Sequence, residues 1–143
     1  GARLLLESLA RLEAGTLRPV SQPPSGARLA PRLSKEEGAV DWATSAERIE
    51  RQIRAFMPWP GAYTTLDGRL VKLVEARVEP ERRPGVGPGE VVTVDSAGGA
   101  ILVGCGDGSI LRILKAQPEG SRVMTGLDLA NGMHLGPGRR FGG

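Results

Sequence analysis

Hydrophobic residues near the start of the chain follow the spacing of a helix. Leu5, Leu9 and Leu12 recur at intervals of four and three, which places them on one helical face. Gly15 is suited to end such a helix because glycine readily adopts the left-handed conformation. The helical pattern begins directly after Gly1 without a capping residue, so we expect this chain to be a piece of a longer polypeptide.

A second helical pattern appears before residue 60. Ile49, Ile53 and Phe56 recur at positions i, i+4 and i+7, which predicts an amphipathic helix. Thr44 and Glu47 are three residues apart, and this spacing predicts a capping box at the start of the helix. The prolines of the string MPWPG that follows predict its end.

Proline-rich stretches lie on both sides of the second helix. Residues 16–32 contain four prolines separated by Ser, Gln and Gly, a composition typical of an extended linker. In MPWPG, each proline disfavours the helical region for the residue before it, so the chain should leave the helix extended. We expect the ring of Trp59 to pack at this junction.

Beyond residue 60 the hydrophobic pattern changes to short β-rich stretches. They predict strands over residues 62–66, 69–78, 90–94, 100–105 and 109–116. The dipeptide Asp67-Gly68 between the first two stretches is a strong signal for a hairpin. A short helix is expected over residues 127–132, followed by a loose tail. The order predicts a mainly β fold with helices: a small OB-like β-barrel preceded by a helix and an extended linker.

The string AILVGCGDGSILRIL resembles a phosphate-binding loop because Gly104, Gly106 and Gly108 follow an apolar run. Such a loop requires a helix immediately after the glycines, since the helix amides hold the phosphate. Here the β-branched string SILRIL follows instead. We therefore interpret Asp107-Gly108 as the tip of a hairpin, and the other two glycines as points of close chain approach.

Charge and composition limit how the chain could bind anions or membranes. The chain has 143 residues and a net charge of +3, and from Gly61 onward ten Lys and Arg residues oppose nine Asp and Glu residues. An anion-binding face must therefore come from the placement of charges and not from their total. No apolar run approaches the roughly 20 residues of a membrane span, so we expect a cytoplasmic protein that does not bind membranes.

The residues that usually carry catalysis are scarce. Cys105 is the only cysteine, and its position in a predicted strand favours a small buried hydrophobic residue over a nucleophile. His134 is the only histidine and lies beside the expected tail. No spacing of Cys and His predicts a metal site. The sequence therefore predicts no catalytic, cofactor-binding or metal-binding residue in this chain.

Several strings together resemble the C-terminal part of methionyl-tRNA formyltransferase: LSKEEGAVDW, IRAFMPWPGAYT, VKL, CGDGSILRIL, QPEG and DLANG. The initial string LLLESLARLEAGTLRPVSQ is similar to the last helix of that family's catalytic domain. The resemblance implies a catalytic-domain helix and tail over residues 1–30, a linker over 31–43 and an OB-like tRNA-binding domain over 44–143.

This resemblance implies an activity for the complete protein and a role for the chain. The family transfers a formyl group from 10-formyltetrahydrofolate to the methionyl amine of initiator tRNA in translation initiation. The catalytic Asn, His and Asp of the family match nothing in this chain, so we expect it to position tRNA and to be inactive alone. The implied partners are initiator methionyl-tRNA and the protein's own catalytic domain. Folate is expected to bind that domain.

Positively charged residues are the candidates for tRNA contact. They are Lys72, Lys115, Arg112, Arg54, Lys35 and Arg122. For Lys72, a side chain that extends to solvent from the barrel rim is as plausible as an RNA contact. The arginines of the second helix are equally compatible with a simple solvated face.

Two other functions remain open. The equivalent domain of a sugar-nucleotide formyltransferase, or of a formyltetrahydrofolate hydrolase-type protein, would also carry strings similar to PWPGA and CGDG. LSKEEG, IRAF, the VKL lysine and QPEG favour the tRNA enzyme. A structural spacer or dimerisation module would have no affinity for RNA.

Overall fold

A computed structural model describes residues 1–143, and its contacts divide them into two units, Gly1–Arg32 and Leu33–Gly143. The first unit consists of helix α1 (Ala2–Glu13), a 3₁₀ turn η1 (Pro24–Gly26) and an otherwise irregular chain. Gly15 follows α1 with φ +67°, so its predicted role at the helix end is confirmed. The leucine face of α1 is exposed within its own unit.

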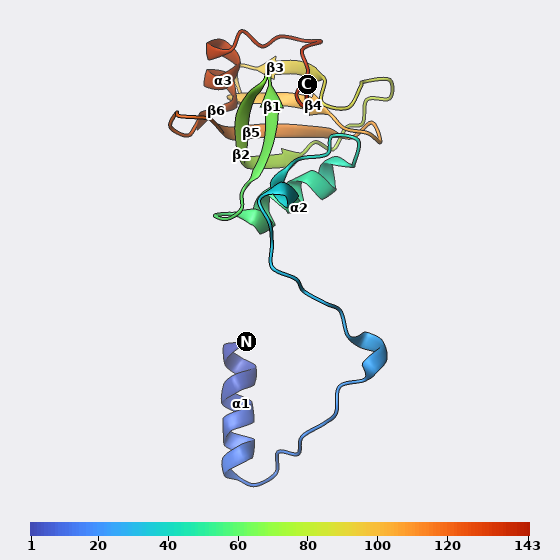
Figure 1. Cartoon of the computed structure of the whole chain (residues 1–143), viewed down its shortest axis with the longest axis vertical. Coiled ribbons are helices and arrows are strands. Elements are labelled where there is room, and N and C mark those ends of the chain that lie inside the picture. The colour runs from blue at the N-terminus through green and yellow to red at the C-terminus, as the bar shows by residue number, and fades with distance from the viewer. The chain divides into compact units, whose positions relative to one another are not determined.

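The second unit is built on one antiparallel sheet (Figure 1). Its strands are β1 (Ala62–Leu66), β2 (Arg69–Val78), β3 (Val91–Asp95), β4 (Ala100–Gly104), β5 (Ile110–Pro118) and β6 (Met124–Thr125). They lie in the order β1-β2-β5-β4-β3, and β6 also pairs with β5. The predicted mainly β fold with helices is confirmed. No strand ladder joins β1 to β3.

Two helices cover the sheet. Figure 1 shows α2 (Ala46–Phe56) and α3 (Gly126–Gly132) at opposite ends of it. Ile49 and Ile53 of α2 are buried in the core, as is Leu129 of α3. Burial of each of these side chains contributes about 1.5–3 kcal/mol to folding, so the apolar faces of the helices hold them on the sheet.

Alternation along β2 and β5 separates the core from the surface. Leu73 lies opposite Ala116, and both are buried. The next pair along the ladder, Lys72 and Gln117, therefore points away from the core, because successive strand residues face opposite sides. All five residues of β4 are buried, which fits a strand covered on both faces.

Both predicted hairpins are present. Asp67 and Gly68 have φ values of +50° and +73°, as the two central residues of a type I′ turn require. Gly108 adopts φ +75° at the tip of the β4–β5 hairpin. A Cβ on Gly106 would lie 1.8 Å from the Ala43 carbonyl oxygen, so this glycine allows the close chain approach that the sequence predicted. The interpretation as a phosphate loop is excluded, since a strand follows these glycines.

Two local expectations were wrong. The N-cap of α2 is Ser45, whose hydroxyl oxygen accepts from the Arg48 amide at 3.3 Å, whereas the Thr44 hydroxyl donates to the Asp41 carbonyl. Neighbouring Thr and Ser are both good caps, so the sequence alone could not choose between them. Trp59 does not pack at the junction, because 54% of its surface is exposed.

The expected loose tail is instead part of the core. Phe141 is 3% exposed and stacks on the buried Trp42 ring, with centroids 5.7 Å apart. The Val91 amide donates to the Arg139 carbonyl, and the Gly142 amide donates to the Thr65 carbonyl. Hydrogen bonds of the tail therefore reach β3 and β1, the two edge strands that no ladder connects.

Residues 33–43, which precede α2, also contact the sheet. Ala39 forms an isolated bridge to Tyr63, and the Val40 amide donates to the Tyr63 carbonyl at 2.8 Å. The Trp42 indole N–H donates to the Thr64 hydroxyl at 2.9 Å. These contacts tie the segment to β1.

We expect Phe141→Ala to lower the free energy of unfolding by about 3–5 kcal/mol, because it removes a buried aromatic side chain that the surrounding core cannot fully replace. Urea unfolding followed by far-UV circular dichroism measures this loss. Trp59→Ala is the matched control, because an exposed aromatic side chain should contribute within about 0.5 kcal/mol. Equal losses in the two variants would contradict the buried tail.

Candidate nucleic-acid interface

Lys72 lies on β2 and faces the outer side of the sheet. It lies between Tyr63 of β1 and Gln117 of β5 in the strand register, while its neighbours Val71 and Leu73 are buried. The side chain of Lys72 is exposed. Its ammonium group therefore faces solvent, where it can meet a phosphate without losing its hydration to the core.

Lys115 lies further along β5 and is paired. Its Nζ atom is 2.8 Å from Oε2 of Glu75, and both side chains are exposed. The hydrogen bond from Lys115 lowers the pKa of Glu75 below its usual value, and the positive charge of Lys115 acts in the same direction. An exposed pair of this kind stabilises a protein by about 0–1 kcal/mol, so a phosphate can compete for Lys115 at small cost.

Arg112 is placed differently from the other candidates. Its guanidinium binds the carboxylates of Glu79 and Asp95, with an Nη1–Oδ2 distance of 2.6 Å to Asp95. The hydrogen bond to Glu79 is the largest cause that raises the pKa of Arg112, followed by the hydrogen bond to Asp95. In return, the hydrogen bond from Arg112 lowers the pKa of Asp95. Two carboxylates therefore already neutralise this cation, which connects β3, β5 and the end of β2. Its predicted contact with tRNA stays a prediction.

Lys35 and Arg54 lie outside the sheet. Arg54 pairs with Glu50 one turn earlier on α2 at 3.2 Å, which is a common exposed helical pair. Lys35 is exposed and precedes the 3₁₀ turn η2 (Glu36–Gly38). A Cβ on Gly38 would lie 3.1 Å from the Tyr63 ring, so this turn is held close to β1.

The ion pairs of the structure separate free cations from neutralised ones. Among the six candidate cations, they leave Lys35, Lys72 and Arg122 without a carboxylate partner. Arg122 and Lys115 line one depression together with Asp128, and Lys72 lines another together with Glu119. We call the surface formed by Lys72, Lys115 and Arg122 the basic face.

Arg54 lies at the border of the basic face. It lines a depression together with Glu75, the carboxylate that holds Lys115. Of the six candidate cations, the structure thus brings Lys72, Lys115, Arg122 and Arg54 toward one region. Arg112 is engaged in its own cluster, and Lys35 lies in the segment that borders β1.

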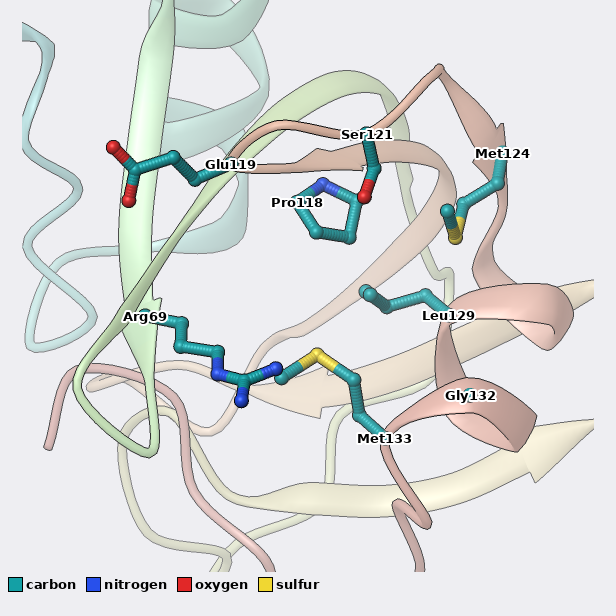
Figure 2. Close-up of a pocket in the computed structure, with 8 residues that line it drawn as sticks. All are labelled: Arg69, Pro118, Glu119, Ser121, Met124, Leu129, Gly132 and Met133. Atoms are coloured by element: carbon teal, nitrogen blue, oxygen red, sulfur yellow. The ribbon is translucent and has the colours of Figure 1, made fainter.

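One cation was missed in the sequence. Arg69 begins β2 directly after the hairpin turn, is exposed, and has no carboxylate partner. It lines a pocket of about 440 Å³ together with Pro118, Glu119, Ser121, Met124, Leu129, Gly132 and Met133 (Figure 2). A residue at a turn carries no pattern that indicates a pocket, since the other lining residues lie about 50 or more positions away.

Cys105 and His134 are the only cysteine and the only histidine of the chain. Cys105 is buried, and burial, with a smaller effect of the negative charge of Asp107, raises the pKa of its thiol to about 12. The thiol therefore stays protonated at neutral pH, and the prediction of a buried hydrophobic residue is confirmed. His134 is exposed, with Nδ1 3.1 Å from the Asn131 carbonyl oxygen.

Two further features of the structure bear on function. No three His, Cys, Asp or Glu side chains gather closely enough to coordinate a metal ion. No helix has both the length and the apolar character needed to cross a membrane.

Fold and site together define a small β-rich domain that offers a cation-bearing outer face. Residues 32–134 match the family model described as "Formyl transferase, C-terminal domain". The chain belongs to this family. The resemblance noted in the sequence is thereby confirmed at the level of the domain.

Two curated relatives carry the same name. The methionyl-tRNA formyltransferase of Anaeromyxobacter dehalogenans (strain 2CP-C) is 45% identical over 134 residues, which cover 93% of this chain and 42% of that protein. That of Geobacter metallireducens is 42% identical and covers 99% of this chain and 44% of that protein. The chain thus spans less than half the length of these relatives.

A solved structure shares the fold. HypX from Aquifex aeolicus, crystallised in complex with tetrahydrofolic acid, superposes with a TM-score of 0.65 and 25% identity. The match covers 93% of this chain and 23% of that chain. A protein of another name therefore contains the same fold.

We expect the Arg112 cluster to make stability depend on pH in acid. The pKa of Asp95 is lowered in the folded state, so its contribution is present above the unfolded value of about 4 and is lost as the pH falls through the folded value. Asp95→Asn should therefore destabilise the protein at pH 6, and its difference from wild type should shrink toward pH 3.

Urea unfolding at several pH values measures this dependence. Glu119→Gln is the control, because this carboxylate is exposed and makes no ion pair. It should leave stability nearly unchanged at both ends of the range. A difference between Asp95→Asn and wild type that stays constant from pH 6 to 3 would show that the ion pair adds nothing.

Proposed function

We propose that this chain is the tRNA-binding part of a methionyl-tRNA formyltransferase, and that its basic face holds initiator methionyl-tRNA. The observation that carries the proposal is Lys72, an exposed cation without a carboxylate partner on the outer side of the β2–β5 ladder. Lys115 and Arg122 lie in the neighbouring depression. The relatives at 42–45% identity carry the name of that enzyme.

The chemistry of the basic face suits a folded RNA. Lysine and arginine side chains on a rigid sheet can contact phosphates at fixed positions, and such contacts position a nucleic acid without reading its bases. Recognition of folded RNA relies largely on shape and on backbone contacts. The low net charge of the domain is compatible with this role, because Lys72 and Arg122 make no ion pair on this face, whereas other cations, such as Arg112, are neutralised internally.

Formyl transfer itself belongs, in this proposal, to the rest of the longer protein. The donor, 10-formyltetrahydrofolate, carries a pterin whose row of donors and acceptors needs several matched polar partners. The pocket of Figure 2 offers one guanidinium, one hydroxyl and one carboxylate among mainly apolar residues, which does not fit a pterin. We therefore assign no folate contact and no reaction step to this chain, and we place the complete enzyme in the cytoplasm.

We expect Lys72→Ala to weaken tRNA binding and to reduce its dependence on salt. Each lost phosphate contact should lower the slope of log K against log salt by about 0.7–0.9. Filter binding or fluorescence anisotropy with initiator tRNA, at several salt concentrations, measures both quantities. The thermal unfolding temperature should stay nearly unchanged, since the side chain is exposed.

Arg83→Ala is the matched control for charge. Arg83 is also an exposed cation without an ion pair. It lies away from the basic face, because its amide donates to the carbonyl of Gly108, just before β5 begins, whereas Gln117 is near the end of β5. It should leave the affinity nearly unchanged. Equal effects of the two substitutions would mean that binding follows net charge alone. Binding of a nucleotide-linked sugar without any binding of tRNA would favour the sugar-nucleotide branch instead.

We also expect the isolated chain to transfer no formyl group from 10-formyltetrahydrofolate to methionyl-tRNA. A charged-tRNA formylation assay with acid-urea gel separation of products tests this, with a complete methionyl-tRNA formyltransferase as positive control. Turnover by these 143 residues would contradict the assignment of the chemistry to the rest of the protein.

A further inference from the structure

The pocket of Figure 2 lies between the cations of the basic face. It shares Met124 and Gly132 with the depression that Lys115 and Arg122 line. On its other side it shares Pro118 and Glu119 with the depression that Lys72 lines. A polyanion that contacts these three cations can therefore also reach the mouth of the pocket.

The lining of the pocket combines an adaptable apolar part with one cation. In Figure 2, Met124 points into the space, the buried Leu129 forms part of the wall, and the Arg69 guanidinium lies beside Met133. Glu119 turns its carboxylate away from these apolar side chains. Methionine side chains are flexible and polarisable, and their sulfur atoms contact aromatic rings favourably.

We propose that this pocket binds one unpaired nucleotide of the RNA on the basic face. The base lies against Met124 and Met133, and its phosphate meets Arg69. This inference rests on the proposed function, because the basic face must first hold an RNA. The pocket would add a site for one base to a surface that otherwise contacts only the phosphate backbone of the RNA.

Three observations favour a nucleotide. Arg69 has no carboxylate partner, so an anion at the mouth gains a charge-assisted hydrogen bond. The volume of about 440 Å³ lies within the usual 300–1,000 Å³ of small-ligand sites. An unpaired base has a flat apolar face for the methionines, while its polar edges can stay in solvent at the mouth.

The continuity of the pocket with Lys72, Lys115 and Arg122 separates a nucleotide from other ligands. An apolar peptide that ends in a carboxylate would also satisfy Met133 and Arg69. It would make no use of the flanking cations, whereas the phosphates on either side of a bound nucleotide would. The arrangement of cations around the pocket thus fits a chain of phosphates.

Methyl NMR of methionine tests the proposal on the full chain. The protein has three methionines, and two of them line the pocket, while Met57 lies at the end of α2. With ¹³C-methyl methionine, saturating initiator tRNA should shift the Met124 and Met133 signals upfield, because ring currents of a stacked base shield them. The Met57 signal should move far less.

Nucleoside 5′-monophosphates provide a second probe. They should shift the same two signals and bind about tenfold more tightly than the corresponding nucleosides, since the phosphate gains a charged hydrogen bond to Arg69. Arg69→Ala should remove this preference for the phosphate while leaving nucleoside binding nearly unchanged. Arg69 is exposed, so the variant should fold.

The outcomes separate this inference from the proposed function. Binding of tRNA with unshifted Met124 and Met133 signals would overturn the nucleotide pocket and leave the basic face in place. Absence of tRNA binding, with the two methionine signals still shifted by nucleoside monophosphates, would overturn the proposed function and with it the assignment of the pocket to a nucleotide of RNA. Shifts caused by an acetylated dipeptide carboxylate, with none caused by nucleotides, would assign the pocket to a peptide and overturn the inference.

Discussion

Strand alternation along the β2–β5 ladder is the constraint on which the rest of the domain depends. Leu73 and Ala116 face the core, and this forces the adjacent pair, Lys72 and Gln117, to the outer side. A slip of one residue would bury the lysine and expose the leucine, so the register is strongly determined. The same hydrophobic pattern that builds the core therefore also places the central cation of the basic face.

Local patterns predicted the structure well, whereas contacts between distant residues escaped the sequence. The hairpin at Asp67 and the glycine-rich hairpin depend on neighbouring residues, so their turn chemistry was sufficient. The packing of Phe141 on Trp42 joins residues 99 positions apart, and nothing in a glycine-rich tail indicates such a partner. The prediction that the Trp59 ring packs at the end of the helix was wrong because an apolar side chain in the sequence does not show which residues will contact it.

For the candidate site too, the sequence predicted some features, whereas others became visible only in the structure. Periodicity and the resemblance identified the cations, but only the structure separates the paired Arg112 from the unpaired Lys72, because Glu79 and Asp95 lie 33 and 17 positions before Arg112. Arg69 was missed for this reason as well, since its pocket is assembled from the end of β5, the turn after it and α3. Charge placement in the fold, and not the net charge, distinguishes a binding face from a solvated one.

The central claim is that the outer side of β2 and β5 holds tRNA. Amide chemical-shift mapping of the ¹⁵N-labelled chain during titration with initiator tRNA tests it most directly. The account predicts the largest changes at Lys72, Lys115 and Gln117 and in the turn over residues 119–123. Changes confined to α1 or to the 80–89 loop, with these residues unmoved, would contradict it.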